Sequence, residues 1–315
     1  MPECLLVLDP GSHTTVQDSG RLGFQKLGVP VSGALDPFAH RVANLLVDNP
    51  EDEAVLECTV TGPTLAFLKQ ADLAVAGGAM DITLNNHAMS GWSSFSVKPG
   101  DVLRLGHAHS GCRTYLAVRG GLDLPLIMGS RSTTVSAELG GFRGRPLAKG
   151  DLLSRRPVEP LARHRTLPRE WVPEYPEAIR LRAIPGPQDD FFAAGLEAFF
   201  TSRFQVGSRA DRMGYRLDGP CIRHKTGAPE SIISEPSLPG NVQVPADGQP
   251  IIILVEQTVG GYAKVASVIT ADLWKVAQAV PGTAVSFQPC TLPEAHFLLR
   301  QQACHLLAVK TYLQG

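Results

Sequence analysis

Short apolar segments separated by turn residues recur along most of this chain of 315 residues. The segments are rich in Val, Ile, Leu and Thr, and the turns between them draw on 31 glycines and 25 prolines. This pattern is typical of a β-rich protein with many turns. It predicts strands at residues 5–8, 64–67, 73–75, 82–84, 102–105, 115–118, 251–255 and 284–287.

Helical spacing is limited to a few regions. Asp36-Pro37 predicts an N-cap followed by proline at the first helical position, with apolar residues at helical spacing behind it. Asp189-Asp190 heads a second predicted helix, and residues 271–280 form a third. Residues 293–313 also have helical apolar spacing, although the last third of this region equally suits a closing strand.

The chain is longer than a usual single hydrophobic core, so two domains are expected. A segment that combines prolines and charges without apolar periodicity runs from Arg155 to Pro176. That composition favours an extended connection over a packed element. We therefore expect an N-terminal domain at residues 1–165 and a C-terminal domain at residues 166–315.

The net charge and the cysteine content limit which classes of binding partner and which cellular compartment are expected. Lys+Arg 29 against Asp+Glu 30 gives a formal net charge of -1, which argues against a general electrostatic grip on nucleic acid or anionic membrane. A small-molecule or protein partner is expected instead. No apolar run approaches the roughly 18 residues of a membrane span, and the start, MPECLLVLDPGSHT, lacks the regions of a signal peptide. Six cysteines without CxxC spacing predict reduced thiols, and we expect a cytoplasmic protein.

Most familiar catalytic signatures are missing from the sequence. It contains no GxxxxGK[ST] phosphate loop, no GxSxG elbow and no GxGxxG after a strand. It also has no Met-flanked lysine of the kind that carries biotin, so any biotin would be attached to another chain. His107 and His109 would share one face of a strand, but no carboxylate or third histidine is evident beside them, and a metal site is not predicted.

The segment from Gly240 to Lys275 is the richest in candidate chemistry. A strand at residues 251–255 is followed by polar groups and by Gly260-Gly261. A glycine pair lets the backbone approach a ligand closely or adopt positive φ, and it is also a common hairpin signal. On spacing alone the hairpin is favoured. The polar candidates in this segment are Gln243, Glu256, Gln257, Tyr262 and Lys264.

Two further loops place arginines beside glycines. In the first, Gln17, Asp18 and Arg21 precede a second glycine-rich stretch that contains Ser32. Such groups bind a carboxylate or phosphate in fork geometry, or Asp18 and Arg21 pair with each other to fix the loop. The second loop, residues 209–216, has three arginines around one glycine and suits either an anionic ligand or surface ion pairs.

Four long stretches of the chain resemble the C subunits of bacterial ATP-dependent 5-oxoprolinase. This family is also labelled KipA-like, the second subunit of allophanate hydrolase, or biotin-dependent carboxyltransferase. The resemblance covers nearly the whole chain in order. The stretches are VQDSGRLGFQKLGVPVSGALDPFAHRVANLLV, YLAVRGGLDLPLIMGSRST, DRMGYRLDGP and QVPADGQPIIILVEQTVGGYAKVASVITADLWKVAQ.

The resemblance implies a mainly β fold with two cyclophilin-like β-barrel domains and a few short helices. It implies a stable complex with a KipI-like B subunit and a looser one with a LamB/YcsF-type A subunit. The implied reaction opens the lactam of 5-oxoproline to glutamate with ATP hydrolysis, and ATP with magnesium is the expected cofactor. Activity is expected only in the complex.

Within that reaction we assign hypothetical roles to the candidates. Arg21, Arg212 and Arg216 would hold phosphates or the substrate carboxylate, and Gln257 with Tyr262 would orient the ring amide. Lys264 is a candidate for acid/base chemistry or a phosphate contact. The remaining candidate contacts to substrate or nucleotide are Gln17, Asp18, Ser32, Gln243, Gly260 and Gly261.

The glycine-pair motif departs from the family pattern. Members usually carry Gln-Thr-Thr-Gly-Gly-Tyr-Pro, whereas this chain has Val259 in place of the second threonine and Ala263 in place of the proline. Two alternatives to the oxoprolinase hypothesis stay open. One is a carboxyltransferase subunit that accepts carboxybiotin for a urea-like substrate, and the other is a non-enzymatic antagonist of a KipI-like kinase inhibitor.

Overall fold

The computed structural model describes residues 3–229 and 231–315. These residues divide into two compact units. Unit 1 consists of the described residues up to Leu22 together with residues 32–175 and 305–315. Unit 2 consists of residues 23–31 and 176–304. The predicted division after residue 165 differs from these units, because both are made of separate stretches of the chain. The predicted domain limits stay a prediction.

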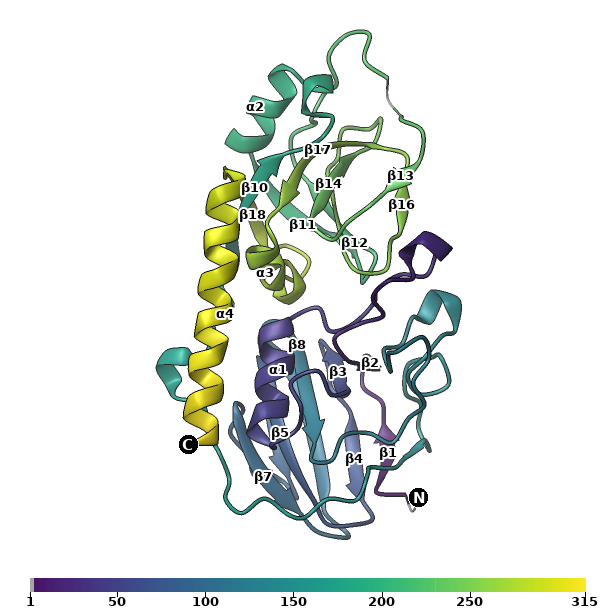
Figure 1. Cartoon of the computed structure of the whole chain (residues 1–315), viewed down its shortest axis with the longest axis vertical. Helices are drawn as coiled ribbons and strands as arrows, with labels where there is room; N and C mark the ends of the chain where they lie inside the picture. Colours follow the sequence, from purple (N-terminus) through teal and green to yellow (C-terminus); the bar gives the residue numbers. More distant parts are fainter. Residues whose placement is uncertain (1–2, 230) are drawn as a thin grey trace. The chain divides into compact units, whose positions relative to one another are not determined.

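Unit 1 is built on one nine-stranded sheet (Figure 1). Its central path runs in the order β2-β3-β8-β4-β1-β9, and β5 continues the sheet by pairing with β6, β7 and β8. The strands are β1 (Leu5–Asp9), β2 (His13–Gln17), β3 (Val55–Thr59), β4 (Thr64–Phe67), β5 (Ala71–Leu84), β6 (His87–Ala88), β7 (Ser93–Val97), β8 (Val102–Val118) and β9 (Leu152–Leu153).

Strands β5 and β8 are each longer than the sequence pattern predicts. Each joins two of the predicted strands into one, and the two pair antiparallel along most of their length. Their register shifts after Gly77, where a β-bulge lets the pairing continue. Gly77 has φ +111°, and a Cβ there would collide with the backbone of Arg113. The glycines that interrupt the apolar pattern therefore mark a bulge and not a strand end.

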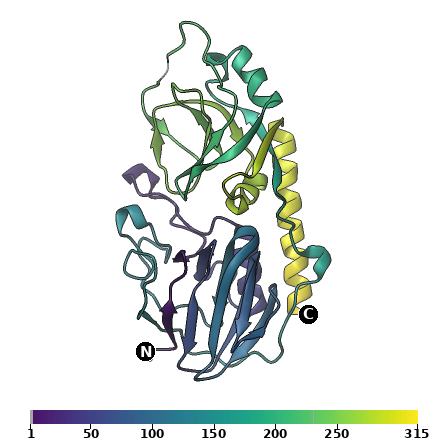
Figure 2. The ribbon, with the colours of Figure 1, turned by 180° about the vertical axis from the view of Figure 1, so that it is seen from behind.

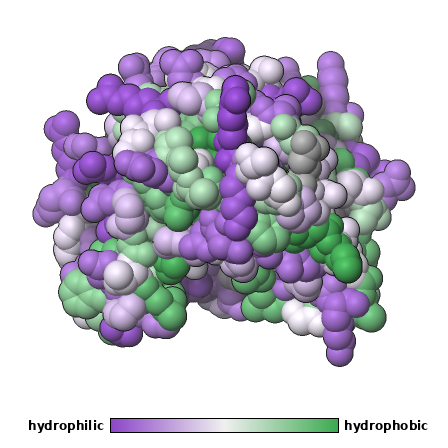
Figure 3. All heavy atoms as spheres, turned by 90° about the horizontal axis from the view of Figure 1, so that it is seen from above, coloured by the Kyte–Doolittle hydropathy of each residue, from purple (hydrophilic) through white to green (hydrophobic). Residues whose placement is uncertain are grey.

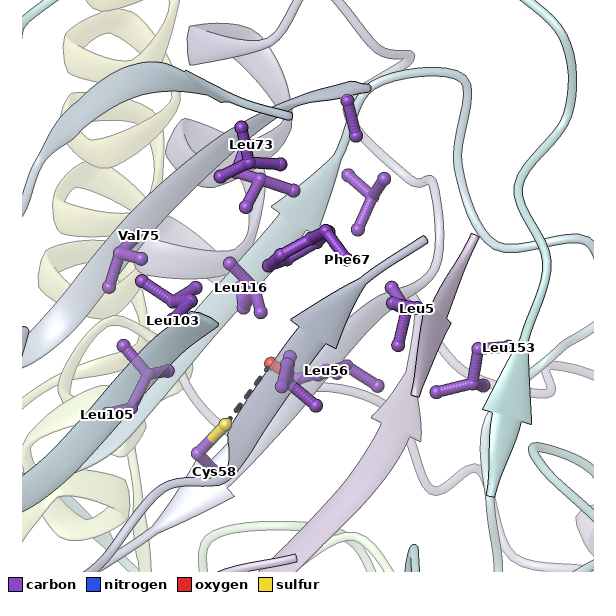
Figure 4. Close-up of a cluster of buried hydrophobic side chains, with 14 of the residues drawn as sticks. Leu5, Leu56, Cys58, Phe67, Leu73, Val75, Leu103, Leu105, Leu116 and Leu153 are labelled. Atoms are coloured by element: carbon purple, nitrogen blue, oxygen red, sulfur yellow. Dashed lines mark hydrogen bonds between the residues drawn. The ribbon is translucent and has the colours of Figure 1, made fainter. Parts of the chain in front are cut away.

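The core of unit 1 lies against this sheet. Large aliphatic side chains from β1, β4, β5 and β8 meet on one face (Figure 4). A second cluster packs α1 (Pro37–Leu46) and the last turns of α4 (Leu292–Gln314) together, with Val309 and Leu313 buried in it. Helix α1 begins as predicted, because the Asp36 carboxylate accepts a hydrogen bond from the N–H of Ala39 at 3.1 Å.

The segment rich in proline and charge has little regular secondary structure, and it belongs to unit 1 as far as Tyr175. Asp72 accepts a hydrogen bond from the N–H of Leu161, and Ser94 accepts one from the N–H of Arg165. The Tyr175 hydroxyl lies 3.3 Å from a carboxylate oxygen of Asp36. These contacts attach the segment to the surface of unit 1. Two short 3-10 helices of this unit are η2 (Val135–Ala137) and η3 (Arg169–Trp171).

Unit 2 is a closed seven-stranded barrel, which Figure 2 shows from behind. Its strands follow the order β10-β17-β14-β15-β12-β11-β18. A separate two-stranded sheet, β13 (Glu235–Pro236) with β16 (Val259–Gly260), accompanies it. The barrel strands are β10 (Ala178–Pro185), β11 (Arg203–Ala210), β12 (Gly214–Asp218), β14 (Asn241–Val244), β15 (Ile251–Ile253), β17 (Ala263–Val268) and β18 (Ala284–Pro289).

The helices of unit 2 partly match their predictions. Asp189 begins a 3-10 turn, η4 (Asp189–Phe191), and α2 (Ala194–Thr201) follows it. Helix α3 (Leu273–Gln278) lies inside the predicted range and follows η5 (Thr270–Asp272). The alternative of a closing strand near the C-terminus is wrong, because α4 is helical over 23 residues. The remaining 3-10 helix is η1 (Gln25–Leu27).

The expected mainly β fold with two barrel-type domains is confirmed, with a closed barrel in unit 2 and a half-barrel in unit 1. Three of the α-helices are short, while α4 is long. No helix in the described part of the chain has the length and hydropathy of a membrane span. Figure 3 shows one face of the surface, on which hydrophilic side chains predominate and hydrophobic ones form smaller groups.

Candidate functional site

The segment around the glycine pair is not the predicted hairpin. Strand β15 pairs with β12 and β14, whereas β17 pairs with β14 and β10, so β14 lies between the two strands that the hairpin would join. Strand β15 also ends at Ile253, two residues earlier than predicted. As a result Gln243 on β14 has Ile251 as its neighbour on one side and Lys264 on the other.

A short segment crosses over these polar residues. Residues 232–237 pair with the chain around Gly260, through β13 and β16 and through two backbone hydrogen bonds that flank them. The N–H of Ile232 donates to Gly261 O at 2.8 Å, and the N–H of Ser237 donates to Thr258 O at 2.9 Å. We call residues 232–237 the covering segment. Its Glu235 and Ser237 are two residues apart and therefore face the same side.

Lys264 is the most buried charged group of this site. Its side chain is 2% exposed, and its Nζ donates to Oε1 of Glu235 at 2.6 Å. Gln188, which precedes η4, donates from Nε2 to the same oxygen at 3.0 Å and accepts from the backbone N–H of Lys264 at 3.1 Å. The hydrogen bonds from Lys264 and Gln188 lower the pKa of Glu235 below its ordinary value, so this carboxylate stays ionised.

Gln243 and the glycine pair form the other half of the site. Gln243 is 2% exposed and its Nε2 donates to Oγ of Ser237 at 3.1 Å. A Cβ at Gly260 would collide with that same amide group and would lie 3.0 Å from Nε2 of Gln257. Neither glycine has positive φ. Gly260 is therefore required for close approach, and the group that approaches is the Gln243 side chain.

Gln257 and Tyr262 lie at the rim of this arrangement. Gln257 donates from Nε2 to the carbonyl of Val259 at 3.0 Å, and Tyr262 is 43% exposed. Val259, which replaces a threonine of the family pattern, is also exposed. Of the two motif departures, Val259 therefore falls on the outer side of the site, whereas Ala263 is fully buried on β17 beside Lys264.

The two arginines of the second predicted loop are held in ion pairs. Arg212 is 6% exposed, and its Nε donates to Oε1 of Glu256 at 2.6 Å. Arg216 pairs with Asp247, a more exposed carboxylate. The backbone carbonyl of Arg212 accepts from the N–H of Glu256, which places this loop beside the residue that precedes Gln257. Their proposed role with phosphate or carboxylate stays a prediction.

Asp18 is the centre of a separate buried network in unit 1. Its carboxylate accepts from Oγ of Ser132 at 2.5 Å, from Oγ of Ser130 at 2.7 Å and from the N–H groups of Arg131 and Gly20. Burial alone would raise the pKa of Asp18. The hydrogen bonds outweigh that effect and hold the pKa below its ordinary value.

Arg21 does not pair with Asp18, which was one of the two alternatives for this loop. Its side chain is fully buried, and it donates to the carbonyls of Ile127 and Ser132 at 3.0 and 2.9 Å and to Oγ1 of Thr134 at 3.3 Å. Burial lowers the pKa of the guanidinium, although a guanidinium stays charged in any case. Asp18 and Arg21 thus hold the same loop, residues 127–134, from two sides.

Gln17 and Ser32 join the same network. Nε2 of Gln17 donates to the carbonyl of Thr133 at 3.1 Å, and the Ser32 hydroxyl donates to that carbonyl at 2.8 Å. Oε1 of Gln17 accepts from the N–H of Gly33. The four candidates from the first glycine-rich region are therefore brought together, but their polar groups hold the protein's own backbone. Their role as ligand contacts stays a prediction.

Sequence reasoning missed three residues of the unit 2 site. Glu235 and Ser237 lie in a proline-containing stretch without periodicity, and Gln188 precedes a predicted helix. No spacing pattern links them to Lys264, because the contacts join residues that are 29 and 76 positions apart. One signal in the sequence was the single acidic residue in the stretch from Ser231 to Asn241.

The His-x-His pair has a carboxylate that the sequence did not indicate. Oδ1 of Asp81 lies 2.8 Å from Nε2 of His109, and both side chains are exposed. Within residues 3–229 and 231–315, no group of three or more metal-ligating side chains comes together. This pair is therefore a surface contact between β5 and β8.

The unit 2 site offers a fixed cation, a carboxylate and several amide groups. An ammonium in a buried setting binds carboxylates or phosphates strongly, because little water competes for it. Gln188, Gln243 and Gln257 supply amide donors and acceptors that suit a ligand with an amide of its own. The arrangement is suited to binding and polarising a small polar anion. It contains no nucleophile held by a base in the manner of a hydrolase triad among the described residues.

Comparison with known proteins places the chain among carboxyltransferase-type proteins. The sequence model of the carboxyltransferase domain, subdomain A and B, matches residues 27–289. The chain is 39% identical to the 5-oxoprolinase C subunit of Escherichia coli over 92% of its own length and 93% of that protein. It is 32% identical to the urea amidolyase of Saccharomyces cerevisiae, of which it covers 17%.

Solved structures give the same grouping. The crystal structure of the K. lactis urea amidolyase matches with a TM-score of 0.92 at 32% identity, over 98% of this chain and 20% of that one. The crystal structure of TTHA0988 matches with a TM-score of 0.83 at 37% identity, over 91% of this chain and 56% of that one. The chain thus spans a fifth and about half of these two structures.

Proposed function

This chain belongs to the family of the carboxyltransferase domain, subdomain A and B, and on that premise we propose that it is the C subunit of an ATP-dependent 5-oxoprolinase. The observation that carries the proposal is the length of the match. The chain covers 93% of the E. coli C subunit and 96% of the Haemophilus influenzae one. It covers only 17% of the yeast urea amidolyase.

The proposed reaction opens the lactam of 5-oxo-L-proline to L-glutamate. A lactam is a stable amide, and transfer of the γ-phosphoryl group of ATP to its carbonyl oxygen turns that oxygen into part of a good leaving group. One water then attacks the activated carbon and the ring C–N bond breaks, so that the nitrogen leaves as the amine and an acyl phosphate remains. A second water attacks this acyl phosphate, phosphate leaves, and glutamate is formed. ATP with magnesium supplies the phosphoryl group, and the arginines and Lys264 are the candidate contacts to its charge.

We assign the activation step to a complex with a KipI-like B subunit, and later steps to a complex that includes a LamB/YcsF-type A subunit. The designation of the bacterial relatives as C subunits supports partner subunits in general. We place the complex in the cytoplasm. The six cysteines are free thiols, which suits a reducing compartment.

Reconstitution tests this function. The purified chain is assayed alone, with its B-like partner, and with both partners, for ATP-dependent release of glutamate from 5-oxoproline. We expect release only with all partners present. Absence of glutamate with every partner present would reject the proposal. Arg212→Ala and Arg216→Ala are assayed in the same complex, and unchanged ATP turnover in both would remove the phosphate role from these arginines.

A carboxyltransferase activity is the second candidate, because the family description and the TM-score of 0.92 with urea amidolyase favour it. In that case the chain would transfer a carboxyl group from carboxybiotin on another protein to a urea-like acceptor. The two candidates separate in one experiment. Transfer of labelled carboxylate from a carboxybiotinylated carrier, without glutamate release, would favour the carboxyltransferase.

A further inference from the structure

Lys264 is a buried ammonium with an unusually small set of acceptors. An ammonium has three N–H donors, and buried charges are normally both paired and fully hydrogen-bonded. Glu235 Oε1 is the single acceptor of the Lys264 Nζ among residues 3–229 and 231–315. Two donors of a group that is 2% exposed are therefore left for another acceptor.

The carboxylate that pairs with Lys264 comes from outside the barrel. Glu235 lies on β13, a two-residue strand that pairs with β16 alone. The side chain of Glu235 is 39% exposed, and Oε1 accepts both of its hydrogen bonds while Oε2 accepts none from the described residues. Rotation of this side chain into water would break two hydrogen bonds and leave the carboxylate well solvated.

Lys264 has no comparable freedom. It lies on β17, whose backbone pairs with β14 on one side and with β10 on the other. The backbone N–H of Lys264 donates a hydrogen bond to Oε1 of Gln188. Strand β17 and strand β14 are both almost entirely buried around this position. The pair therefore combines a fixed cation with an anion that is able to leave.

We infer that Lys264 is a binding site for the carboxylate of a small ligand, and that Glu235 is the internal competitor which this ligand displaces. An incoming carboxylate that replaces Glu235 keeps the buried ammonium neutralised, whereas a neutral ligand would leave it unpaired at a large cost. A carboxylate also presents two oxygens to the donors that Glu235 engages. The site therefore selects a monoanionic carboxylate.

The neighbouring amides refine the class of ligand. When Glu235 leaves, Nε2 of Gln188 loses its acceptor, and Gln243 lies across the strand pair from Lys264. A ligand with an amide close to its carboxylate would satisfy these groups together. On the proposed function that ligand is 5-oxoproline, so the inference assigns the substrate carboxylate to Lys264 instead of to Arg21, Arg212 or Arg216.

Binding to the purified full chain tests the inference, measured by calorimetry with three probes. The probes are 5-oxoproline, acetate, and 2-pyrrolidinone, which has the lactam ring without the carboxylate. Glu235→Gln removes the competing charge, so we expect it to bind 5-oxoproline about tenfold more tightly than the wild type, with a smaller gain for acetate and none for pyrrolidinone. Lys264→Met should abolish the gain when it is combined with Glu235→Gln.

Asp247→Asn is the matched control. It removes the carboxylate that pairs with Arg216, just as Glu235→Gln removes the carboxylate that pairs with Lys264, and both pairs lie in unit 2. We expect no gain in affinity from it. A gain from Asp247→Asn without one from Glu235→Gln would move the carboxylate to Arg216 and overturn the inference. A Glu235→Gln affinity no higher than that of the wild type, including no detectable binding in either, would overturn it as well. A gain of affinity is a result that misfolding cannot produce.

The glutamate assay separates this inference from the proposed function. Turnover by the complex without any gain in Glu235→Gln would reject the carboxylate site and leave the oxoprolinase intact. A gain for 5-oxoproline or acetate that Lys264→Met removes, together with no glutamate release, would support the carboxylate site and reject the oxoprolinase.

Discussion

Arg21 in unit 1 and Lys264 in unit 2 are both buried cations beside glycine-containing loops, yet their surroundings differ in kind. Arg21 meets two backbone carbonyls and a threonine hydroxyl, all from one loop. Lys264 meets one carboxylate, which belongs to an exposed segment outside the barrel. Burial of a charge therefore does not by itself indicate a binding site. The number of acceptors and the freedom of those acceptors to move separate a structural cation from one available to a ligand.

The largest effect is expected from Arg21→Met. It removes three hydrogen bonds of a fully buried charged group and leaves the carbonyl of the buried Ser132 without this donor, while the Ile127 carbonyl keeps the N–H of Ser130, so we expect unfolding to become easier by about 3–5 kcal/mol. Urea denaturation measures this. Arg209→Met, at an exposed position of β11, is the control and should change stability little. A loss below about 1 kcal/mol for Arg21→Met would contradict the structural role.

Asp18→Asn should cost about 2 kcal/mol at neutral pH, because four donors then face a neutral amide. The effect depends on pH in a defined direction. The folded pKa of Asp18 is lowered, so its carboxylate adds stability above the unfolded value of about 4, and that contribution is lost as the pH falls through the folded pKa. Denaturation midpoints of wild type and variant should therefore converge below about pH 4, and a constant difference would contradict the assignment.

Gly260→Ala tests the close approach of Gln243. The added methyl group would collide with the Gln243 amide, so we expect a loss of about 1–2 kcal/mol. Gln243→Ala removes the obstacle, and the double variant should recover most of the loss that Gly260→Ala causes on its own. Gly261→Ala is the matched control, because the nearest atom to its added methyl group would be the Ile232 carbonyl oxygen at 3.3 Å. Simple additivity in the Gly260→Ala, Gln243→Ala cycle would show that the two sites do not touch.

The smallest effect is expected from Lys264→Met, and it is the sharpest contrast with Arg21→Met. An apolar side chain of similar length replaces a poorly satisfied buried charge, and Glu235 is exposed enough to turn to water. We expect the free energy of unfolding to change by less than about 1 kcal/mol in either direction. Thermal and urea unfolding both measure it. A loss as large as that of Arg21→Met would make Lys264 a structural cation.

Local sequence signals predicted the elements whose causes are local. Asp36-Pro37 set the start of α1, and apolar runs located β1, β4, β15, β18 and the two ends of both β5 and β8. Prediction failed where the structure depends on pairing between strands that are far apart in the sequence. The bulge at Gly77 hid the continuity of β5, and β14, placed between β15 and β17 by barrel closure, removed the hairpin that the glycine pair indicated.

The candidate site was predictable only in part, for the same reason. Lys264, Gln243 and Gly260 were found because they lie in one stretch with many polar residues, and β14 and β17 bring the first two together. Glu235 and Gln188 come from segments with no pattern of their own, and only tertiary contacts connect them to Lys264. A pair between Asp18 and Arg21 was one of the two alternatives for their loop, but each of them hydrogen-bonds to loop 127–134 instead.

Helix α4 has a consequence for the order in which the protein is made. Its last turns bring Leu306, Val309 and Leu313 into the second core cluster of unit 1, whose other members come from the first 167 residues. Domains usually fold from the N-terminus during synthesis. Here the first unit to emerge from the ribosome keeps part of its apolar surface uncovered until residue 313 has been added. Synthesis of unit 1 therefore starts before that of unit 2, but the core of unit 1 is completed only after unit 2 has been made.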